Sequence, residues 1–336
     1  MIKICLIGGG RAGMIHARNY QFRIPGAKVT AVVDPDEKNA RESAEELGVP
    51  LFSEFREALD KVEFSAVCIG APTFVHVNAV VEAAEAGKDI FCEKPLSISL
   101  NEAERMQKAV EDNGVKFQIG FMRRFDASFV RAKKMIEEGK IGDPILVKSV
   151  GRSPGSGRLS AWIADVEKSN GVLAEVNTHD FDVIRWLVDS DFREVFSYAD
   201  NLKCPSYEEE YPEFYDTAAV NIKFENGILG MVDGCYPATY GYDARTEVLG
   251  TEGMLQVGSK ESHSVLIWNK SGDIVSEGNR GWQSLFAEAY LEEDRYFVKC
   301  LQEDRAPRPN IVDGKKAVEI VLAANESIKT GEPVKL

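Results

Sequence analysis

The segment Ile2-Lys-Ile-Cys-Leu-Ile-Gly8-Gly-Gly10-Arg-Ala-Gly13 decides the fold of the first part of the chain. An apolar run of strand length leads into glycines with the spacing G-x-G-x-x-G, and a helix-compatible stretch follows. In a dinucleotide-binding unit the first glycine permits a tight turn, the second lets the backbone approach a pyrophosphate, and the third lets the helix pack closely on the strand. Amide groups at the start of the helix then point towards the anion. The segment therefore predicts a dinucleotide-binding loop, with a structural turn of some other α/β protein as the alternative.

An acidic residue, Asp34, ends the second predicted strand, which covers residues 28–33. It follows Gly13 by about 20 residues, the spacing of the acid that binds the adenosine ribose hydroxyls in such units. A carboxylate at this position would repel the 2′-phosphate of NADP. The sequence therefore predicts NAD as the cofactor, with preference over NADP.

The composition limits the classes of protein to which the chain can belong. Its 336 residues are enough for two domains, and 44% of them are apolar. A net charge of −14 argues against nucleic acid or an anionic membrane as the main partner. The six cysteines form no C-x-x-C pair, which favours free thiols over a zinc site or a disulfide framework. Because no apolar run is long enough to span a bilayer and Met1 leads directly into the first strand, we expect a cytoplasmic protein without a signal peptide.

The rhythm of predicted elements changes near residue 122. Before it, short apolar strands alternate with helices, which predicts an α/β Rossmann domain with a doubly wound parallel sheet over residues 1–122. One helix of this part begins at a capping box formed by Ser99 and Glu102. After it, strands follow one another, so we expect an α+β substrate-binding and oligomerisation domain over residues 123–336, with a large, mostly antiparallel open sheet. The predicted strands cover residues 145–150, 195–199, 216–224, 228–235, 245–249, 254–257 and 264–268, and two helices at about 282–302 and 313–329 end the chain.

Several motifs of the chain resemble the family of glucose-fructose oxidoreductase, inositol dehydrogenase and rhizopine-catabolism oxidoreductases. The motifs are the N-terminal glycine loop, Ala71-Pro-Thr73 with His76, Glu93-Lys94-Pro95, and Gly171 followed by His179-Asp-Phe-Asp182. Phe121-Met-Arg-Arg-Phe-Asp126 and Tyr240-Gly-Tyr-Asp243 are similar to segments of the inositol 2-dehydrogenase branch. The resemblance covers the whole chain and implies a nicotinamide enzyme for cyclic polyols and sugars, as a homodimer or homotetramer. Two positions depart from the family pattern: Glu175 replaces the usual aspartate, and Asn170-Gly171 replaces a glycine pair.

The candidate catalytic residues are Lys94, His179 and Glu175. Lys94 follows a strand end, where ligands bind in open parallel sheets, and the resemblance implies that it is catalytic. A cis bond to Pro95 would fix its position. If the stretch around them is helical, Glu175 and His179 project from one face, and a histidine near neutral pH suits proton abstraction from an alcohol. A core histidine, or half of a metal site without a visible third ligand, are the alternatives for His179, and we expect no metal.

Other residues are candidates for binding. For the cofactor we expect contacts from Gly8, Gly10, Arg11, Ala12, Gly13, Asp34, Ala71, Thr73, His76, Glu93, Lys94 and Arg123. For the substrate we expect contacts from Lys94, Arg152, Glu175, His179 and Tyr240. A solvated arginine pair is the alternative for Arg123 and its neighbour Arg124. Tyr240 and Tyr242 are predicted to alternate on a strand and so to share one face.

These residues together predict an NAD-dependent dehydrogenase that oxidises a secondary hydroxyl of a cyclic polyol or sugar. His179 would take the hydroxyl proton, Lys94 would stabilise the alkoxide, and the hydride would pass to the nicotinamide. One alternative is oxidation at ring C3 of a glycoside before an elimination. A second alternative is an NAD-binding sensor without catalysis, which would not need Lys94 and His179.

Overall fold

The structure is a computed structural model that describes residues 1–155 and 161–336. Its described residues form two compact units. Unit 1 comprises Met1–Phe125 and Glu288–Val318, and unit 2 comprises Asp126–Ala287 and Glu319–Leu336. A late segment of the chain thus returns to the first unit, which is a feature that the expected division at residue 122 does not include. Each unit is described below by itself.

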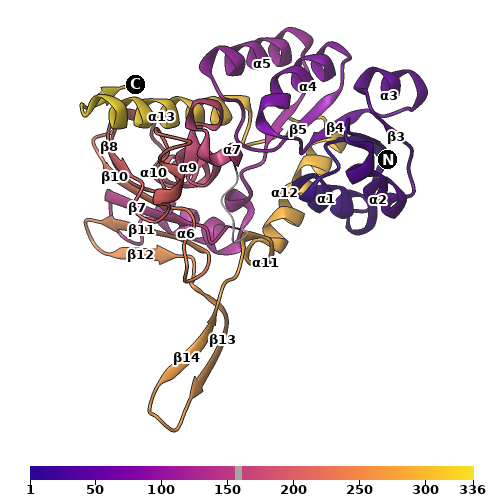
Figure 1. Ribbon diagram of the computed structural model, residues 1–336. Coiled ribbons are helices and arrows are strands. Elements are labelled where there is room, and N and C mark those ends of the chain that lie inside the picture. The colour runs from indigo at the N-terminus through magenta and orange to yellow at the C-terminus, as the bar shows by residue number, and fades with distance from the viewer. Residues whose placement is uncertain (156–160) are drawn as a thin grey trace. The chain divides into compact units, whose positions relative to one another are not determined.

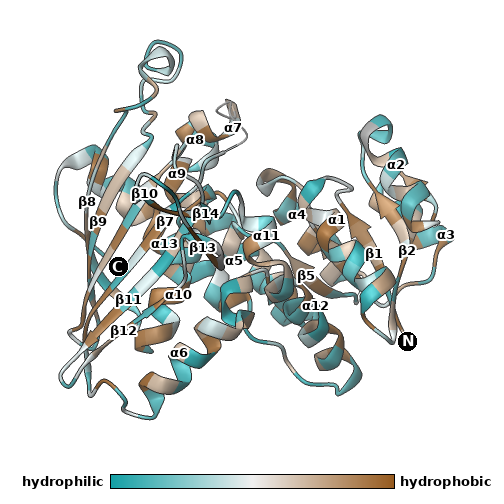
Figure 2. Ribbon diagram, turned by 90° about the horizontal axis from the view of Figure 1, so that it is seen from below, coloured by the Kyte–Doolittle hydropathy of each residue, from teal (hydrophilic) through white to brown (hydrophobic). Residues whose placement is uncertain are grey.

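Unit 1 contains a parallel sheet of six described strands in the order β3-β2-β1-β4-β5-β6. The strands are β1 (Ile2–Ile7), β2 (Ala27–Val33), β3 (Leu51–Phe52), β4 (Ala66–Ile69), β5 (Asp89–Cys92) and β6 (Phe117–Ile119). All residues of β4 are buried, as expected for a strand that is covered on both faces, and Figure 2 shows β1 and β2 in hydrophobic colours. The predicted doubly wound sheet is confirmed.

Helices cover both faces of this sheet. They are α1 (Arg11–Arg18), continued by a π-helical turn (Asn19–Arg23), α2 (Glu37–Leu47), α3 (Phe55–Lys61), α4 (Thr73–Glu85), α5 (Leu100–Asn113) and α12 (Ala287–Gln302), with a 3-10 turn (Met122–Phe125) after β6. Figure 1 shows α4 and α5 on one side of the sheet and α1, α2 and α12 on the other. Phe297 of α12 lies in the same hydrophobic cluster as Leu6 and Phe91. The returning segment therefore completes the core of unit 1.

The predicted start of α5 is also confirmed. The Ser99 hydroxyl accepts a hydrogen bond from the Glu102 backbone N–H, and Gly114 ends the helix with a φ of 64°. A left-handed residue at this position is the usual glycine termination of a helix.

Unit 2 contains a mixed sheet in the order β12-β11-β7-β10-β9-β8-β15. The strands are β7 (Pro144–Arg152), β8 (Phe192–Asp200), β9 (Thr217–Phe224), β10 (Leu229–Cys235), β11 (Asp243–Gly250), β12 (Met254–Val257) and β15 (Val334–Lys335). Among the described strand pairs of this sheet, β7 and β10 are parallel and the others are antiparallel. The expected large and mostly antiparallel sheet is confirmed.

The helices of unit 2 leave one face of this sheet open. They are α6 (Ala127–Glu137), α7 (Ala161–Ala164), α8 (Val166–Ser169), α9 (Gly171–Glu175), α10 (Thr178–Val188), a 3-10 turn (Pro205–Tyr207), α11 (Trp282–Leu285) and the end of α13 (Ile311–Thr330). Burial alternates along β9, so one face is in the core and the other is accessible. The open face presents Tyr198, Leu229, Met231 and Met254, which are all exposed.

A two-stranded ribbon of β13 (Glu261–Trp268) and β14 (Ile274–Gly278) extends away from the rest of unit 2 (Figure 1). Ile267, Trp268 and Ile274 on it are exposed. With these exposed side chains, the ribbon forms a second apolar surface of this unit. An isolated hairpin of this kind is only marginally stable in water. None of the described helices is both long enough and apolar enough to cross a membrane.

Candidate functional site

Backbone contacts between glycines form the loop that follows β1. A Cβ atom on Gly8, which has a φ of 94°, would lie 2.6 Å from the Ala71 backbone nitrogen. A Cβ atom on Gly13 would lie 2.1 Å from the Gly8 carbonyl oxygen, and one on Gly70 would lie 2.5 Å from the Gly13 Cα. Side chains at these positions would force the backbones apart. The end of β1, the start of α1 and the end of β4 therefore meet without side chains between them.

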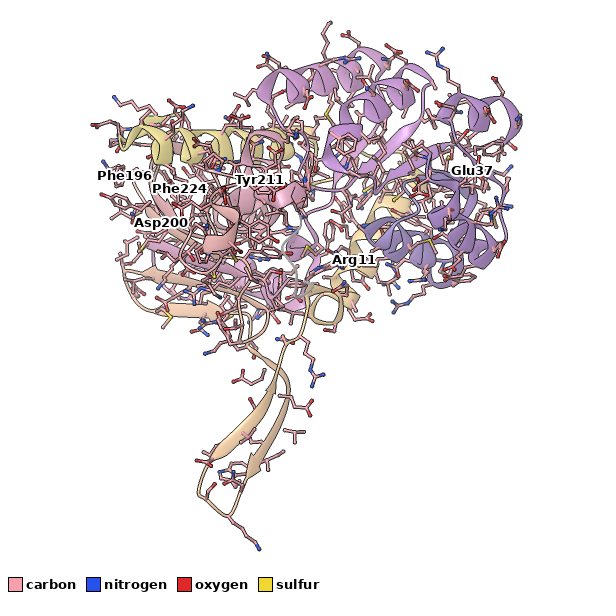
Figure 3. All side chains as sticks on the ribbon, viewed as in Figure 1. Arg11, Glu37, Phe196, Asp200, Tyr211 and Phe224 are labelled. Atoms are coloured by element: carbon pink, nitrogen blue, oxygen red, sulfur yellow. The ribbon has the colours of Figure 1, made fainter. Side chains whose placement is uncertain are left out.

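Gly10 lies in a different environment from these glycines. A Cβ atom on Gly10 would meet no described atom within 4 Å, so the space above this residue is open. Gly10 is the N-cap of α1, and since glycine has no side chain, it forms no side-chain capping hydrogen bond with the first turn of the helix. Arg11, labelled in Figure 3, and Ala12 follow in the first turn. Open space in front of the first turn of a helix is the arrangement that binds the pyrophosphate of a dinucleotide, so this loop fits NAD.

Asp34 lies directly beside this loop, at the end of β2. Its Oδ2 accepts a hydrogen bond from the Gly9 backbone N–H at 2.9 Å, and its Oδ1 accepts one from the Asp36 N–H at 2.9 Å. Two carboxylate oxygens can accept about four hydrogen bonds, so capacity for ribose hydroxyls is left. Contact of Asp34 with the ribose stays a prediction.

The ends of β4 and β5 carry the remaining cofactor candidates of unit 1. Thr73 opens α4, and the His76 ring places one nitrogen 2.9 Å from the Ala71 carbonyl oxygen and the other 2.9 Å from the Pro95 carbonyl oxygen. Burial lowers the pKa of His76 below its usual value. The ring thus joins the loop after β4 to the segment after β5. Contact of His76 with the cofactor stays a prediction.

Lys94 lies two residues after the end of β5, and the Lys94–Pro95 peptide bond is cis. Its backbone N–H donates to Glu93 Oε2 at 2.9 Å. Glu93 itself is buried, and its other carboxylate oxygen contacts His16. Lys94 therefore lies at the carboxyl edge of the parallel sheet on a backbone that its neighbours hold in place.

The arginine pair of unit 1 is not solvated. Arg123 is 1% exposed, and Arg124 forms an ion pair with Asp313 at 3.1 Å. The alternative of a solvated pair is wrong, because the 3-10 turn places both side chains against the interior of this unit. A contact of Arg123 with cofactor or substrate stays a prediction.

In unit 2, Glu175 and His179 do not share one continuous helix. Glu175 is the last residue of α9, and His179 lies in the first turn of α10, with Val176 and Asn177 between the two helices. The expectation of a single helical face is therefore wrong. The Glu175 Oε1 accepts a hydrogen bond from the Trp162 indole N–H at 2.8 Å, and His179 is 6% exposed.

The break before His179 has a physical cause in the sheet below it. The Asn177 Nδ2 donates to Asp180 Oδ2 at 3.0 Å and to the Gly151 carbonyl oxygen at 3.3 Å. The Asp180 Oδ1 accepts from the Ser149 hydroxyl at 2.6 Å. Glycines in β7 and β10 permit this approach, since a Cβ on Gly151 would lie 1.9 Å from Asp180 Oδ2 and one on Gly234 would lie 2.0 Å from Asn177 Oδ1. The start of α10, and with it His179, is thus anchored to the sheet.

Arg152 and Tyr240 are brought together at the end of β7. The Arg152 Nε donates to Asp233 Oδ1 at 2.5 Å, and its Nη1 lies 3.3 Å from the Tyr240 hydroxyl. The Tyr240 hydroxyl donates to Asp243 Oδ2 at 2.8 Å, and Arg245 forms two further hydrogen bonds with the same carboxylate. The hydrogen bond with Asp233 raises the pKa of Arg152. This network of charged and hydroxyl groups is suited to binding a polyhydroxylated molecule.

Tyr240 and Tyr242 do not lie on a strand. Both precede β11, and Tyr240 is 52% exposed whereas Tyr242 is 7% exposed. The prediction that they share one face is wrong, because the irregular backbone around Gly241, with a φ of 121°, does not have the two-residue period of a strand.

Several residues that hold the candidate site residues in place by hydrogen bonds were not predicted from the sequence. These are Trp162, Asn177, Asp180, Asp233 and Asp243 in unit 2, and His16 and Asp294 in unit 1. Asp233 carried a usable signal, since it is a charged residue within an otherwise apolar predicted strand. Among the described residues, no three His, Cys, Asp or Glu side chains are grouped so that they could hold a metal ion.

Comparisons with known proteins agree with both units. A family model described as oxidoreductase family, NAD-binding Rossmann fold, matches residues 2–121. A second, described as oxidoreductase family, C-terminal alpha/beta domain, matches residues 133–336.

Similar proteins match the chain over its full length. The scyllo-inositol 2-dehydrogenase (NAD(+)) of Bacillus subtilis is 35% identical, over 100% of this chain and 96% of that protein. The myo-inositol 2-dehydrogenase of Thermotoga maritima is 33% identical, over 100% and 98% of the two chains. The solved scyllo-inositol dehydrogenase from Lactobacillus casei with bound cofactor NAD(H) and scyllo-inositol has a TM-score of 0.93 at 30% identity, covering 100% of this chain and 99% of that one.

The glycine loop generates a first prediction. Gly10→Ala should leave the unfolding free energy within about 1 kcal/mol of wild type, as for other N-cap changes, but should weaken NADH binding about tenfold or more. Gly13→Ala should lower the unfolding free energy by about 1–3 kcal/mol, because its Cβ overlaps a backbone oxygen. Urea unfolding and NADH fluorescence titration measure the two effects. Unchanged NADH affinity in Gly10→Ala would place the pyrophosphate elsewhere.

Asp34 generates a second prediction. We expect the kcat/KM for NAD to exceed that for NADP by more than about tenfold, which corresponds to about 1.4 kcal/mol of repulsion and lost ribose bonding. Asp34→Ser should narrow this ratio, whereas Glu37→Gln, which removes a nearby exposed carboxylate, should not. Equal efficiency of the wild-type enzyme with both cofactors would refute the assignment.

Proposed function

The chain belongs to the family of glucose-fructose oxidoreductase, inositol dehydrogenase and rhizopine-catabolism oxidoreductases, and from this premise we propose that it is an NAD-dependent dehydrogenase acting on a secondary hydroxyl of a cyclic polyol. The observation that carries the proposal is the occurrence, on one chain, of a glycine loop that fits NAD, a lysine at the carboxyl edge of the same sheet, and a histidine anchored on the second unit. The similar proteins that are named as inositol 2-dehydrogenases support polyol oxidation over the two alternatives, which are oxidation at ring C3 of a glycoside and an NAD-binding sensor without catalysis.

The proposed roles follow from the chemistry of the side chains. The imidazole of His179 takes the proton of the reacting hydroxyl, as a general base active near neutral pH. The Lys94 ammonium donates a hydrogen bond to the oxygen on which negative charge develops. NAD, when bound, supplies the hydride acceptor, and the glycine loop with Asp34 holds it. Each of these roles needs a side chain in a defined position, and the backbone around both residues is held by buried hydrogen bonds.

We assign substrate hydroxyls to the network around Arg152. The guanidinium groups donate hydrogen bonds and the neighbouring carboxylates accept them. Because each hydroxyl of a polyol can both donate and accept a hydrogen bond, the network can bind such a molecule. Burial opposes the charge of Asp243, but the hydrogen bonds from Arg245 and Tyr240 lower its pKa, so this carboxylate stays an acceptor at neutral pH.

Glu175 is the position at which the substrate preference is expected to differ from that of an aspartate enzyme. Its carboxylate is one methylene further from the backbone, and one of its oxygens is directed to the Trp162 indole. A hydroxyl or carboxylate left without its partner costs about 1–3 kcal/mol. We therefore propose that myo-inositol is not the preferred substrate.

We further propose a cytoplasmic homo-oligomer, a dimer or a tetramer. The free cysteines, of which Cys5, Cys68, Cys92 and Cys300 are buried, suit a reducing compartment. The open sheet face presents exposed apolar side chains, among them Leu229, Met231 and Met254, and a second copy of the chain would cover them.

A substrate panel tests the function. Wild-type enzyme with NAD should form NADH with one or more inositols or monosaccharides, and Lys94→Ala and His179→Ala should each lose about 10²–10⁴-fold in kcat while still binding NADH. Lys108→Ala, an exposed lysine of α5, is the matched control and should behave as wild type. Glycosides alone as substrates would favour C3 oxidation, and NADH binding without any turnover would favour a sensor.

Light scattering tests the assembly. We expect a dimer or a tetramer at micromolar concentration, and Met231→Glu on the open face should shift it towards monomer by burying a charge. Phe22→Glu, an exposed apolar position of unit 1, serves as the control. A wild-type protein that is monomeric under these conditions would contradict the proposal.

A further inference from the structure

A fully buried histidine in unit 1 lies between two carboxylates. The His16 Nδ1 is 2.7 Å from Asp294 Oδ1, and its Nε2 is 2.9 Å from Glu93 Oε1. His16 and Asp294 are 0% exposed and Glu93 is 6% exposed. The three residues come from α1, the end of β5 and α12, so they connect segments that are far apart in the chain.

This geometry determines the number of protons. A neutral imidazole carries one N–H and can donate to one carboxylate, which leaves its second nitrogen lone pair facing the lone pairs of the other. A ring with both nitrogens protonated donates to both carboxylates and halves the buried negative charge. Burial opposes a charged ring, but the charges and hydrogen bonds of Asp294 and Glu93 raise the pKa of His16 well above its usual value. Burial likewise opposes the charge of Glu93, yet His16 lowers the pKa of Glu93 below its usual value.

The groups around the ring hold it in this orientation. The centroids of the Phe91 and Tyr290 rings lie 4.6 Å and 5.5 Å from that of His16. Asn19 Nδ2 donates to Asp294 Oδ2 at 2.8 Å, which fixes the second oxygen of that carboxylate.

Other titratable groups also face the cluster. Burial and the carboxylates raise the pKa values of Tyr20, Cys68 and Cys92. The buried Glu293 lies next to Asp294, and the charge of Lys94 acts on Glu93. The hydroxyl and the thiols therefore stay neutral, and the carboxylates dominate the field at His16.

The cluster ends at the backbone of Lys94. The Glu93 Oε2 accepts the Lys94 N–H at 2.9 Å, while the other oxygen of Glu93 contacts the His16 ring. On the other side of Lys94, the carbonyl of Pro95 contacts the His76 ring. A continuous series of hydrogen bonds thus runs from α12 through His16 and Glu93 to the proposed catalytic lysine.

We propose that His16, protonated on both ring nitrogens and held between Glu93 and Asp294, is the positioning residue of Lys94. The inference rests on the proposed function, in which Lys94 stabilises the developing alkoxide. Without the cation, two buried carboxylates would lie close to each other with no charge between them, so Glu93 would take up a proton or turn away. Either change removes or weakens its hydrogen bond to the Lys94 backbone, and a displacement of about 1 Å at a reacting group can cost about 10²-fold in rate.

Ring nitrogen NMR tests the charge state directly. The chain has four histidines, so protein labelled with ¹⁵N-histidine gives a small set of ring signals. We expect the His16 signals to remain those of an imidazolium as the pH rises above the ordinary pKa of histidine, and to be absent from His16→Gln. His76 is the internal contrast, since burial lowers its pKa, so its ring signals should become those of a neutral imidazole at a lower pH than those of His16. A His16 ring that titrates near its ordinary pKa would overturn the proposal.

Kinetics of Asp294→Asn tests the positioning role. We expect kcat to fall about 10–100-fold, with KM for the polyol and the Kd of NADH within about twofold of wild type, because Lys94 is displaced rather than the cofactor site. Asp294→Glu, which keeps the charge, should recover part of the loss. Glu292→Gln, an exposed carboxylate on the same helix, is the control and should keep wild-type kcat.

The outcomes separate this inference from the proposed function. Wild-type turnover together with an unchanged kcat in Asp294→Asn overturns only the positioning role. Absence of turnover in the wild type overturns the proposed function and the positioning role with it, while the ring signals still judge the charge state. If Asp294→Asn does not fold, Asn19→Ala, which removes one hydrogen bond from Asp294, takes its place and should lower kcat several-fold.

Discussion

Direct contact between glycine backbones is the constraint on which unit 1 depends. Gly13 packs on the Gly8 carbonyl, Gly70 packs on Gly13, and Gly8 packs on Ala71. These contacts join the ends of β1 and β4 to the start of α1 in a single junction, so the helix amides that would face a pyrophosphate have a fixed position relative to the strand ends. Because β5 pairs with β4, the edge that carries Lys94 belongs to the same rigid arrangement. The cofactor loop and the proposed reacting lysine are therefore positioned by the same backbone packing.

Local patterns were sufficient to predict the parallel sheet of unit 1 and most strands of unit 2. The glycine spacing, the buried apolar runs and the capping box of Ser99 are all short-range signals, and the structure contains the elements that they indicate. The parallel pairing of β7 with β10 depends on a partner distant in sequence, and β15 has only two residues, so no local pattern indicates either. β14, which pairs with the preceding β13, was also not predicted. In the same way, a helix at about 282–302 was predicted, where the structure has α11 and α12, but the core that α12 completes was not predicted.

The candidate residues were recognisable by type and motif, whereas their supports were not. Asn177, Asp180 and Asp294 are polar residues that a sequence places on the surface by default, and only the fold buries them against partners. The helix break before His179 arises from the same limitation, since the Asn177 amide bonds to strand carbonyls that are far away in the chain. Tyr242 shows a different kind of error. The two-residue period of a strand was applied to residues 240–242, which precede β11 and do not form a strand.

The return of residues 288–318 to unit 1 limits how the chain can be divided by engineering. A fragment that stops at residue 125 would lack the aromatic ring of Phe297 in its core and the carboxylate of Asp294 beside His16. A chimera that exchanges the nucleotide-binding unit between relatives, to change cofactor specificity, therefore needs three crossover points. They lie after residue 125, before residue 288 and after residue 318. Recombination between homologous genes that cuts the chain once, near the middle, would separate partners that fold together.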